Sequence, residues 1–210
     1  MSDTRHKNGL TLIELLVAMV VTSIVMTAVA TLAFAVSSAN KATDDTSEKQ
    51  AQIRFATLKI SELIRHSKLI CSITNEELLV WRADDTPGGD NGINVGELVY
   101  IETGNNTIRL LEFTDVPVGL QTVPFTLAML SGLKAWFISQ CTERYAVLVP
   151  ECSNVQFGFL PVVPPRSRFV TISFNVAENG IEHPYQINAA LLGWAGNLLG
   201  ASDDIVSDDD

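Results

Sequence analysis

The chain has 210 residues, of which 47% are hydrophobic and 18% are charged, and its formal net charge is −10. This length and hydrophobic fraction are typical of one folded domain with an appendage, and they exclude a chain that is disordered throughout. The acidic balance excludes nucleic acid as a general partner, because phosphate contacts need lysine and arginine. The mean hydropathy is positive, at +0.22, which indicates that apolar residues are concentrated in one part of the chain.

The apolar residues are concentrated near the N-terminus. Residues 10–36 include 21 hydrophobic side chains and one charged side chain, Glu14. About 20 apolar residues span a bilayer as a helix, and at about 1.5 Å per residue this run is roughly 40 Å long. Residues 1–9 form a short leader with a net positive charge. The leader is therefore expected in the cytoplasm, and the rest of the chain on the other side of the membrane.

Two simple interpretations of this segment compete. The first is a cleaved secretory signal peptide, for which Ala33-Phe34-Ala35 offers a cleavage site of small residues. The second is a plain signal anchor. The run is longer than the 7–15 residues of an ordinary signal peptide core, and neither interpretation explains a carboxylate near the start of a membrane segment, where an isolated charge is costly.

The residues around the start of the run form a motif. Residues 8–19 read NGLTLIELLVAM, which resembles the class III signal of type IV pilins and type II secretion pseudopilins. The resemblance implies that a prepilin peptidase cuts after Gly9, that Leu10 is the N-methylated first residue of the mature chain, and that Glu14 acts in assembly. These families usually have Phe or Met where this chain has Leu10.

In that role, Glu14 of one subunit meets the new ammonium of its neighbour. Each charge is costly alone in an apolar bundle, and together they fix the register. The alternative is that Glu14 extends to the lipid headgroups.

The helix is expected to continue beyond the membrane, because residues 10–81 contain no proline or glycine. Residues 37–67 are more polar and have the pattern of an amphipathic helix. Their apolar positions recur at spacings of three and four, which places them on one face; they are Ile53, Ala56, Ile60, Leu63 and Ile64. The sequence therefore predicts one helix of roughly 55 residues, with one face packed on a globular head.

Residues 68–200 are expected to form an antiparallel β-rich head. Turn signals stand between short strand-like runs, most clearly Gly104-Asn105-Asn106 and Asn179-Gly180. The runs are 69–74, 78–82, 97–102, 107–113, 145–149, 155–160, 169–177 and 185–192, with a short helix within 124–140. Helices and strands do not alternate as in a parallel sheet. The predicted fold class is α+β.

A long N-terminal helix on an antiparallel sheet resembles the layout of a J-type minor pseudopilin of type II secretion, or a W-type minor type IV pilin. The resemblance implies three partners: the prepilin peptidase, other pilin-like subunits and inner-membrane lipid. It places the N-terminus in the cytoplasm and the head in the periplasm. Protein secretion, pilus extension and DNA uptake stay open as the purpose. A different class also stays open, a signal-anchored extracytoplasmic binding module that does not polymerise.

Residues 84–97 resemble an incomplete calcium loop. Asp90 and Glu97 occupy the fifth and twelfth positions of an EF-hand alignment, which calcium requires. The first position is not acidic unless an insertion lets Asp84 or Asp85 serve there. The alternative is a polar, glycine-rich loop between two strands. Calcium is the only cofactor that the sequence indicates.

Two of the three cysteines are candidates for a disulfide. Cys141 and Cys152 are eleven residues apart and flank a predicted strand. Outside the cytoplasm they can form a disulfide worth about 2–3 kcal/mol, and unpaired thiols are the equal alternative. Cys71 is left over and is expected to be buried.

No catalytic motif stands out, and the chain is predicted not to be an enzyme. None of the three histidines has a serine or cysteine nucleophile in a known motif, and no phosphate-binding loop is present. His66 is expected at the C-terminal end of the long helix, interacting with its dipole. The tail, residues 201–210, is acidic and is predicted to be disordered; a calcium or partner contact is the alternative there.

Overall fold

The computed structural model describes residues 11–83, 93–121, 123, 125–130, 132–160, 164–193, 198–200 and 205. The chain divides into an N-terminal unit, residues 1–47, and a head, residues 48–210, which are described separately below. One helix, α1 (Leu12–His66, 55 residues), contributes to both. The predicted long helix is confirmed, and its length is possible because neither proline nor glycine interrupts it.

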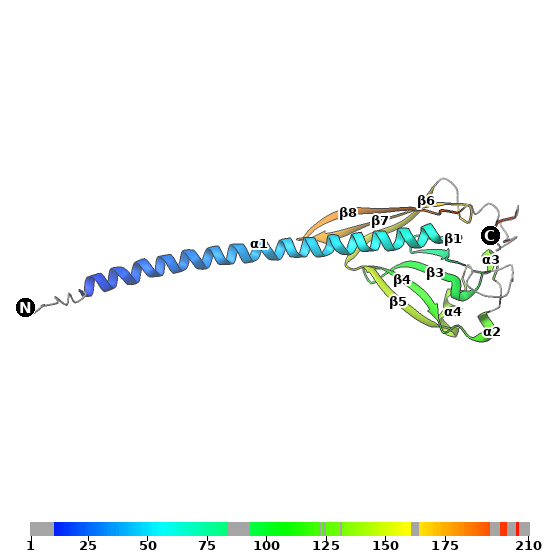
Figure 1. Ribbon diagram of the computed structural model, residues 1–210, viewed down its shortest axis with the longest axis horizontal. Helices are drawn as coiled ribbons and strands as arrows, with labels where there is room; N and C mark the ends of the chain where they lie inside the picture. The colour runs from blue at the N-terminus through cyan, green and yellow to red at the C-terminus, as the bar shows by residue number, and fades with distance from the viewer. Residues whose placement is uncertain are drawn as a thin grey trace, which may run out of the picture. The chain divides into compact units, whose positions relative to one another are not determined.

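The head contains two antiparallel sheets (Figure 1). The five-stranded sheet is formed by β1 (Leu69–Ile73), β2 (Glu77–Trp81), β3 (Leu98–Gly104), β4 (Thr107–Thr114) and β5 (Thr142–Val149). The three-stranded sheet is formed by β6 (Cys152–Leu160), β7 (Phe169–Glu178) and β8 (Ile181–Ala190). In both sheets each strand pairs with the next strand along the chain. The α+β class is confirmed, with two sheets in the head.

Both predicted hairpin turns are confirmed. Asn105 and Asn106 have φ values of 52° and 57°, and Asn179 and Gly180 have φ values of 51° and 79°. Two successive left-handed residues make the two-residue turn that matches the twist of antiparallel strands. β8 begins directly after its turn, four residues earlier than predicted. It accommodates Pro184 because β8 is an edge strand, where a missing N–H need not cost a ladder hydrogen bond.

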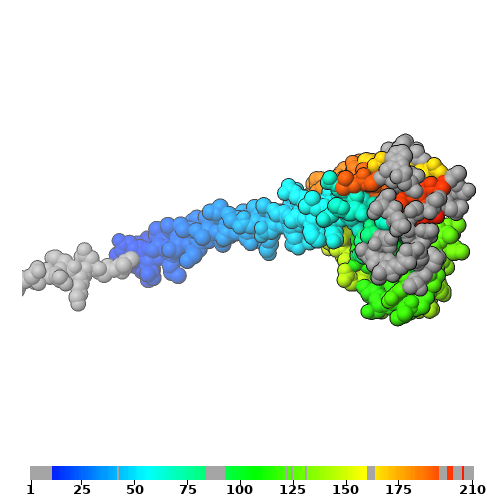
Figure 2. All heavy atoms as spheres, turned by 45° about the vertical axis from the view of Figure 1, so that its right-hand side comes forward, coloured from blue at the N-terminus to red at the C-terminus, as the bar shows by residue number. Residues whose placement is uncertain are grey.

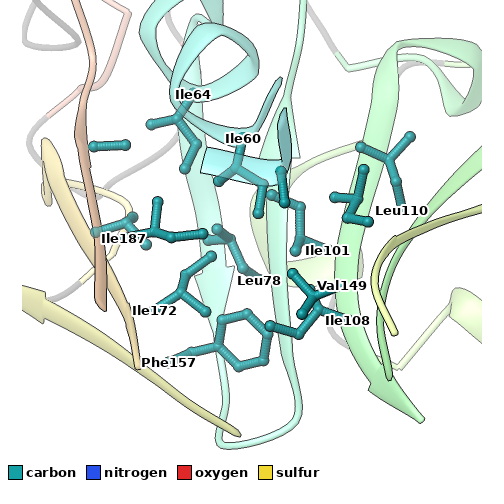
Figure 3. Packing of buried hydrophobic residues seen from close by; sticks show 14 of the residues in the cluster. Ile60, Ile64, Leu78, Ile101, Ile108, Leu110, Val149, Phe157, Ile172 and Ile187 are labelled. Carbon is teal, nitrogen blue, oxygen red and sulfur yellow. The ribbon is translucent and has the colours of Figure 1, made fainter. Parts of the chain in front are cut away.

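The first hydrophobic core lies between the two sheets and the head portion of α1. Ile53, Ala56, Ile60 and Ile64 are buried, at 7% exposure or less, so the predicted helix face is confirmed. They pack against side chains from every strand of both sheets, and Figure 3 shows Ile60 and Ile64 above Leu78 and Ile187. Complete burial of one such side chain stabilises the fold by about 1.5–3 kcal/mol.

A second, aromatic core covers the other face of the five-stranded sheet. Tyr100, Phe113, Phe125 and Phe137 are buried there, with neighbouring ring centroids 5.2–6.0 Å apart. Two short helices contribute to this layer, α3 (Leu127–Leu130) and α4 (Lys134–Gln140), whereas a third, α2 (Val118–Gln121), contributes no buried residue. The single helix predicted within 124–140 is therefore wrong. Gly132, with a φ of 98°, separates α3 from α4 in a conformation that a helix cannot contain.

Cys141 and Cys152, the candidate disulfide pair, are free thiols in the structure, and so is Cys71. Cys141 follows α4 and packs against the aromatic core, whereas Cys152 is buried in the first core at the start of β6. The two side chains thus belong to different cores. Burial raises the pKa of the Cys71, Cys141 and Cys152 thiols, which disfavours the reactive thiolate.

Candidate assembly segment at the N-terminus

The start of α1 is fixed by reciprocal hydrogen bonds between Thr11 and Glu14. The backbone N–H and the hydroxyl of Thr11 donate to Oε2 of Glu14 at 2.9 Å and 2.8 Å, and the backbone N–H of Glu14 donates to Oγ1 of Thr11 at 3.4 Å. This arrangement is a capping box, which satisfies amide groups that lack a partner in the first turn. It explains why the helix begins at Leu12.

Thr11 is a residue that the sequence reasoning missed as part of the site. The signal was present, because Thr-x-x-Glu before an apolar run is the pattern of a capping box. Both of these donors to the Glu14 carboxylate meet the same oxygen, Oε2. Within the described part of the chain, Oε1 has no hydrogen-bond donor. The capping box therefore holds the carboxylate at the end of the helix and leaves one of its oxygens available.

The segment that follows Glu14 is exposed and apolar on every side. Each described side chain from Leu12 to Val36 is exposed, and the blue spheres in Figure 2 show one face of it. A helix that is apolar all round belongs in lipid or among other helices. α1 is a helix long and apolar enough to cross a membrane. Its most apolar stretch is 0% buried.

The four hydroxyl side chains inside this segment are satisfied by the helix itself. Thr22, Ser23, Thr27 and Thr31 each donate to a backbone carbonyl three or four residues earlier, at 2.5–2.8 Å. Such internal hydrogen bonds let hydroxyl residues enter lipid at low cost. Among the polar side chains between Leu12 and Val36, only Glu14 carries a charge.

The predicted cleavage residues, Gly9 and Leu10, lie outside the described residues, and so do three of the predicted calcium ligands, Asp84, Asp85 and Asp90. Glu97 is described and is 2% exposed. No group of three or more metal-ligating side chains occurs in the part of the chain that the structure describes. Calcium binding stays a prediction.

Glu97 has a structural role in the head. Its Oε2 accepts hydrogen bonds from the indole Nε1 of Trp81 at 3.0 Å and from the backbone N–H of Asn94 at 3.1 Å. Asn94 and Glu97 form the capping box of a short 3-10 helix, Val95–Glu97. This carboxylate therefore anchors the chain segment that enters β3 to the end of β2.

Replacing Trp81 with phenylalanine tests this anchor. The change removes the indole donor and leaves a buried carboxylate with one fewer partner, so we expect the free energy of unfolding to fall by about 1–3 kcal/mol. Urea unfolding of the full chain in detergent, followed by circular dichroism, measures the change. Glu97→Gln keeps an acceptor oxygen and should cost less than Glu97→Leu; equal losses for these two variants would contradict a hydrogen-bonding role.

Two further predictions concern His66 and the acidic tail. His66 is the last residue of α1, beside Arg65, as predicted. Of the acidic tail, residues 201–204 and 206–210 lie outside the described residues. Ile205 is described and forms an isolated antiparallel bridge with Leu199.

The comparisons with known proteins agree with the N-terminal geometry. Residues 4–30 match the family model of the prokaryotic N-terminal methylation motif, the cleavage motif of type IV prepilins. The comparisons with curated proteins and with solved structures found no match. The chain therefore has a pilin-like N-terminal segment, and its α+β architecture is of the pilin-like kind.

Proposed function

We propose that the chain is a pilin-like precursor that is cut after Gly9 and assembles through residues 10–36 into a periplasmic pseudopilus or pilus. The observation that carries this proposal is the match of residues 4–30 to the methylation motif, placed at the start of an exposed, apolar helix. Cleavage would create an ammonium at Leu10. The capping box leaves an oxygen of Glu14 available to such an ammonium on a neighbouring subunit.

Within this proposal the chain is a minor subunit of the J-type or W-type. The layout that supports this assignment is a long helix joined to an antiparallel head, which those subunits share. The positive leader, with Arg5 and Lys7, favours an N-terminus in the cytoplasm and a head in the periplasm. The competing function is an anchored binding module that keeps its leader and does not polymerise.

Processing by a prepilin peptidase distinguishes the two functions. We expect that co-expression with the peptidase removes residues 1–9, so that the mature chain begins at Leu10. Gly9→Val should remain full length, because a branched side chain blocks the cut at the residue that the motif requires to be small. Intact-mass measurement and N-terminal sequencing provide the readout. A mature chain beginning at Met1 or Val36 would overturn the proposal.

A further inference from the structure

The end of α1 is basic, unlike the chain as a whole. Residues 59–68 include three lysines or arginines against one carboxylate, Glu62, whereas the whole chain has 14 lysines and arginines and 24 aspartates and glutamates. Cations in the last turn of a helix interact favourably with the negative end of its dipole, which accounts for Arg65 and His66. Lys59 lies about two turns before His66, where that interaction has faded, and therefore needs another explanation.

Lys59 lines a hollow in the surface of the head. The hollow has a volume of about 300 Å³, and its lining comes from one face of α1 and from the residue after β2: Lys59, Glu62, Leu63, His66 and Arg82. The four α1 residues are three or four positions apart, so they are neighbours on the helix surface. The backbone fixes the fifth, because the N–H of Lys68 donates to the carbonyl of Trp81 at 2.9 Å. We call the hollow lined by these five residues the basic hollow.

The charges of the basic hollow favour an anion. The ammonium of Lys59 forms no hydrogen bond or ion pair with the residues that the structure describes. Arg82 shares a carboxylate with another arginine, since Glu112 pairs with Arg82 at 3.4 Å and with Arg144 at 2.7 Å. Among the described residues that line the hollow, Glu62 is the one acid, against two cations. A carboxylate placed there can accept charge-assisted hydrogen bonds from Lys59 and Arg82.

The C-terminal tail carries such carboxylates. Five of the last eight residues are aspartates, and residues 208–210 are all aspartate. The segment that leads to the tail meets the head beside the basic hollow. The N–H of Leu192 donates to the carbonyl of Arg65, in the last turn of α1, at 3.0 Å. Further on, Ile205 packs against the second core, which includes Trp81, the sequence neighbour of a residue that lines the hollow.

Length and tethering favour the tail over an acidic segment of another molecule. Five residues follow Ile205, and an extended chain spans about 3.3–3.6 Å per residue, so the last aspartate can lie up to roughly 17 Å from Ile205. A short flexible tether gives the tail an effective concentration in about the millimolar range at the head surface. A weak charge pairing is therefore sufficient to hold the tail, whereas a separate molecule has to bind tightly to compete.

We propose that the aspartates of residues 208–210 bind in the basic hollow of their own chain and close it to acidic segments of other proteins. The carboxylates pair with Lys59 and Arg82. This inference concerns the head alone and is independent of cleavage after Gly9.

Photo-crosslinking from the tail of the full chain, in detergent micelles, tests the proposal. A photo-crosslinker is placed at Ser207, the uncharged residue before the last three aspartates. We expect crosslinked peptides that contain Arg82 or part of residues 59–66, identified by mass spectrometry. In a mixture of isotope-labelled and unlabelled chains, both halves of each crosslinked peptide should carry the same label, because the tail binds within its own chain.

Charge variants separate ion pairing from simple proximity. Lys59→Gln should lower the yield of these peptides about two- to fivefold, the range expected for an exposed ion pair. The combined change of Asp208→Asn, Asp209→Asn and Asp210→Asn should lower the yield at least as much. Lys41→Gln is the matched control, because Lys41 is also an exposed lysine of α1 but lies outside the head. It should leave the yield unchanged.

Three results would overturn the proposal. The first is crosslinking to other parts of the head without enrichment at the basic hollow. The second is a yield that Lys59→Gln and the triple asparagine variant leave unchanged, which would show that charge does not hold the tail. The third is crosslinked peptides of mixed label, which would show that the tail binds another copy. Thermal unfolding of each variant checks that the head stays folded.

Discussion

Glu14→Ala is expected to leave cleavage after Gly9 unchanged and to lower the assembled fraction of the chain about 10- to 100-fold. In the proposed assembly, the variant leaves the ammonium of a neighbouring subunit without its carboxylate in an apolar surrounding. A hydrogen bond to a charged group is worth about 1.5–3 kcal/mol, which corresponds to this range. The assembled fraction is measured by sedimenting filaments from lysed cells and quantifying the chain by immunoblot, with intact mass reporting cleavage.

Asp44→Ala is the matched control for this variant. It also removes an exposed carboxylate from α1, but outside the apolar segment, and it should assemble normally. Thr11→Val removes the hydroxyl of the capping box and keeps the carboxylate, so it separates helix capping from charge pairing; we expect it to lose less assembly than Glu14→Ala. Normal incorporation of Glu14→Ala would contradict the pairing role.

Ile60→Ala is expected to lower the free energy of unfolding of the head by about 2–5 kcal/mol. Ile60 is 0% exposed in the first core, where α1 meets both sheets, so the change loses apolar contacts and leaves a cavity. Urea unfolding of the full chain in detergent, followed by tryptophan fluorescence, measures the loss.

Leu58→Ala serves as the matched control for the cavity. Leu58 lies on the same helix, two residues away, and is 70% exposed, so the change should alter stability by less than about 0.5 kcal/mol. A similar loss for both variants would contradict packing in the core as the cause of the effect of Ile60→Ala, because alanine itself favours the helix.

Local signals in the sequence were enough to predict the elements that depend on neighbouring residues. The absence of proline and glycine predicted α1, and the spacing of Ile53, Ala56, Ile60 and Ile64 predicted its buried face, because a helix repeats every 3.6 residues. Asn179-Gly180 predicted a hairpin turn because few other residue pairs adopt two left-handed conformations in succession.

Groups that meet only in the folded chain could not be placed from the sequence. Cys141 and Cys152 are close in sequence, yet α4 and β6 place them in different cores. The spacing that places Glu97 in a calcium loop gives no sign of the indole of Trp81, sixteen residues away, which donates to its carboxylate. Lys134 gave no signal, because its partners Glu77 and Glu102 come from two strands far away in the sequence.

The sequence by itself determined the N-terminal segment of this protein, because a long apolar helix and the methylation motif at its start depend only on residues a few positions apart. The tertiary structure decided the head. There, the ion pairs of Lys134 and the hollow that joins Lys59 to Arg82 depend on which strands and helices pack together. Core packing joins residues distant in sequence, and no local pattern specifies it.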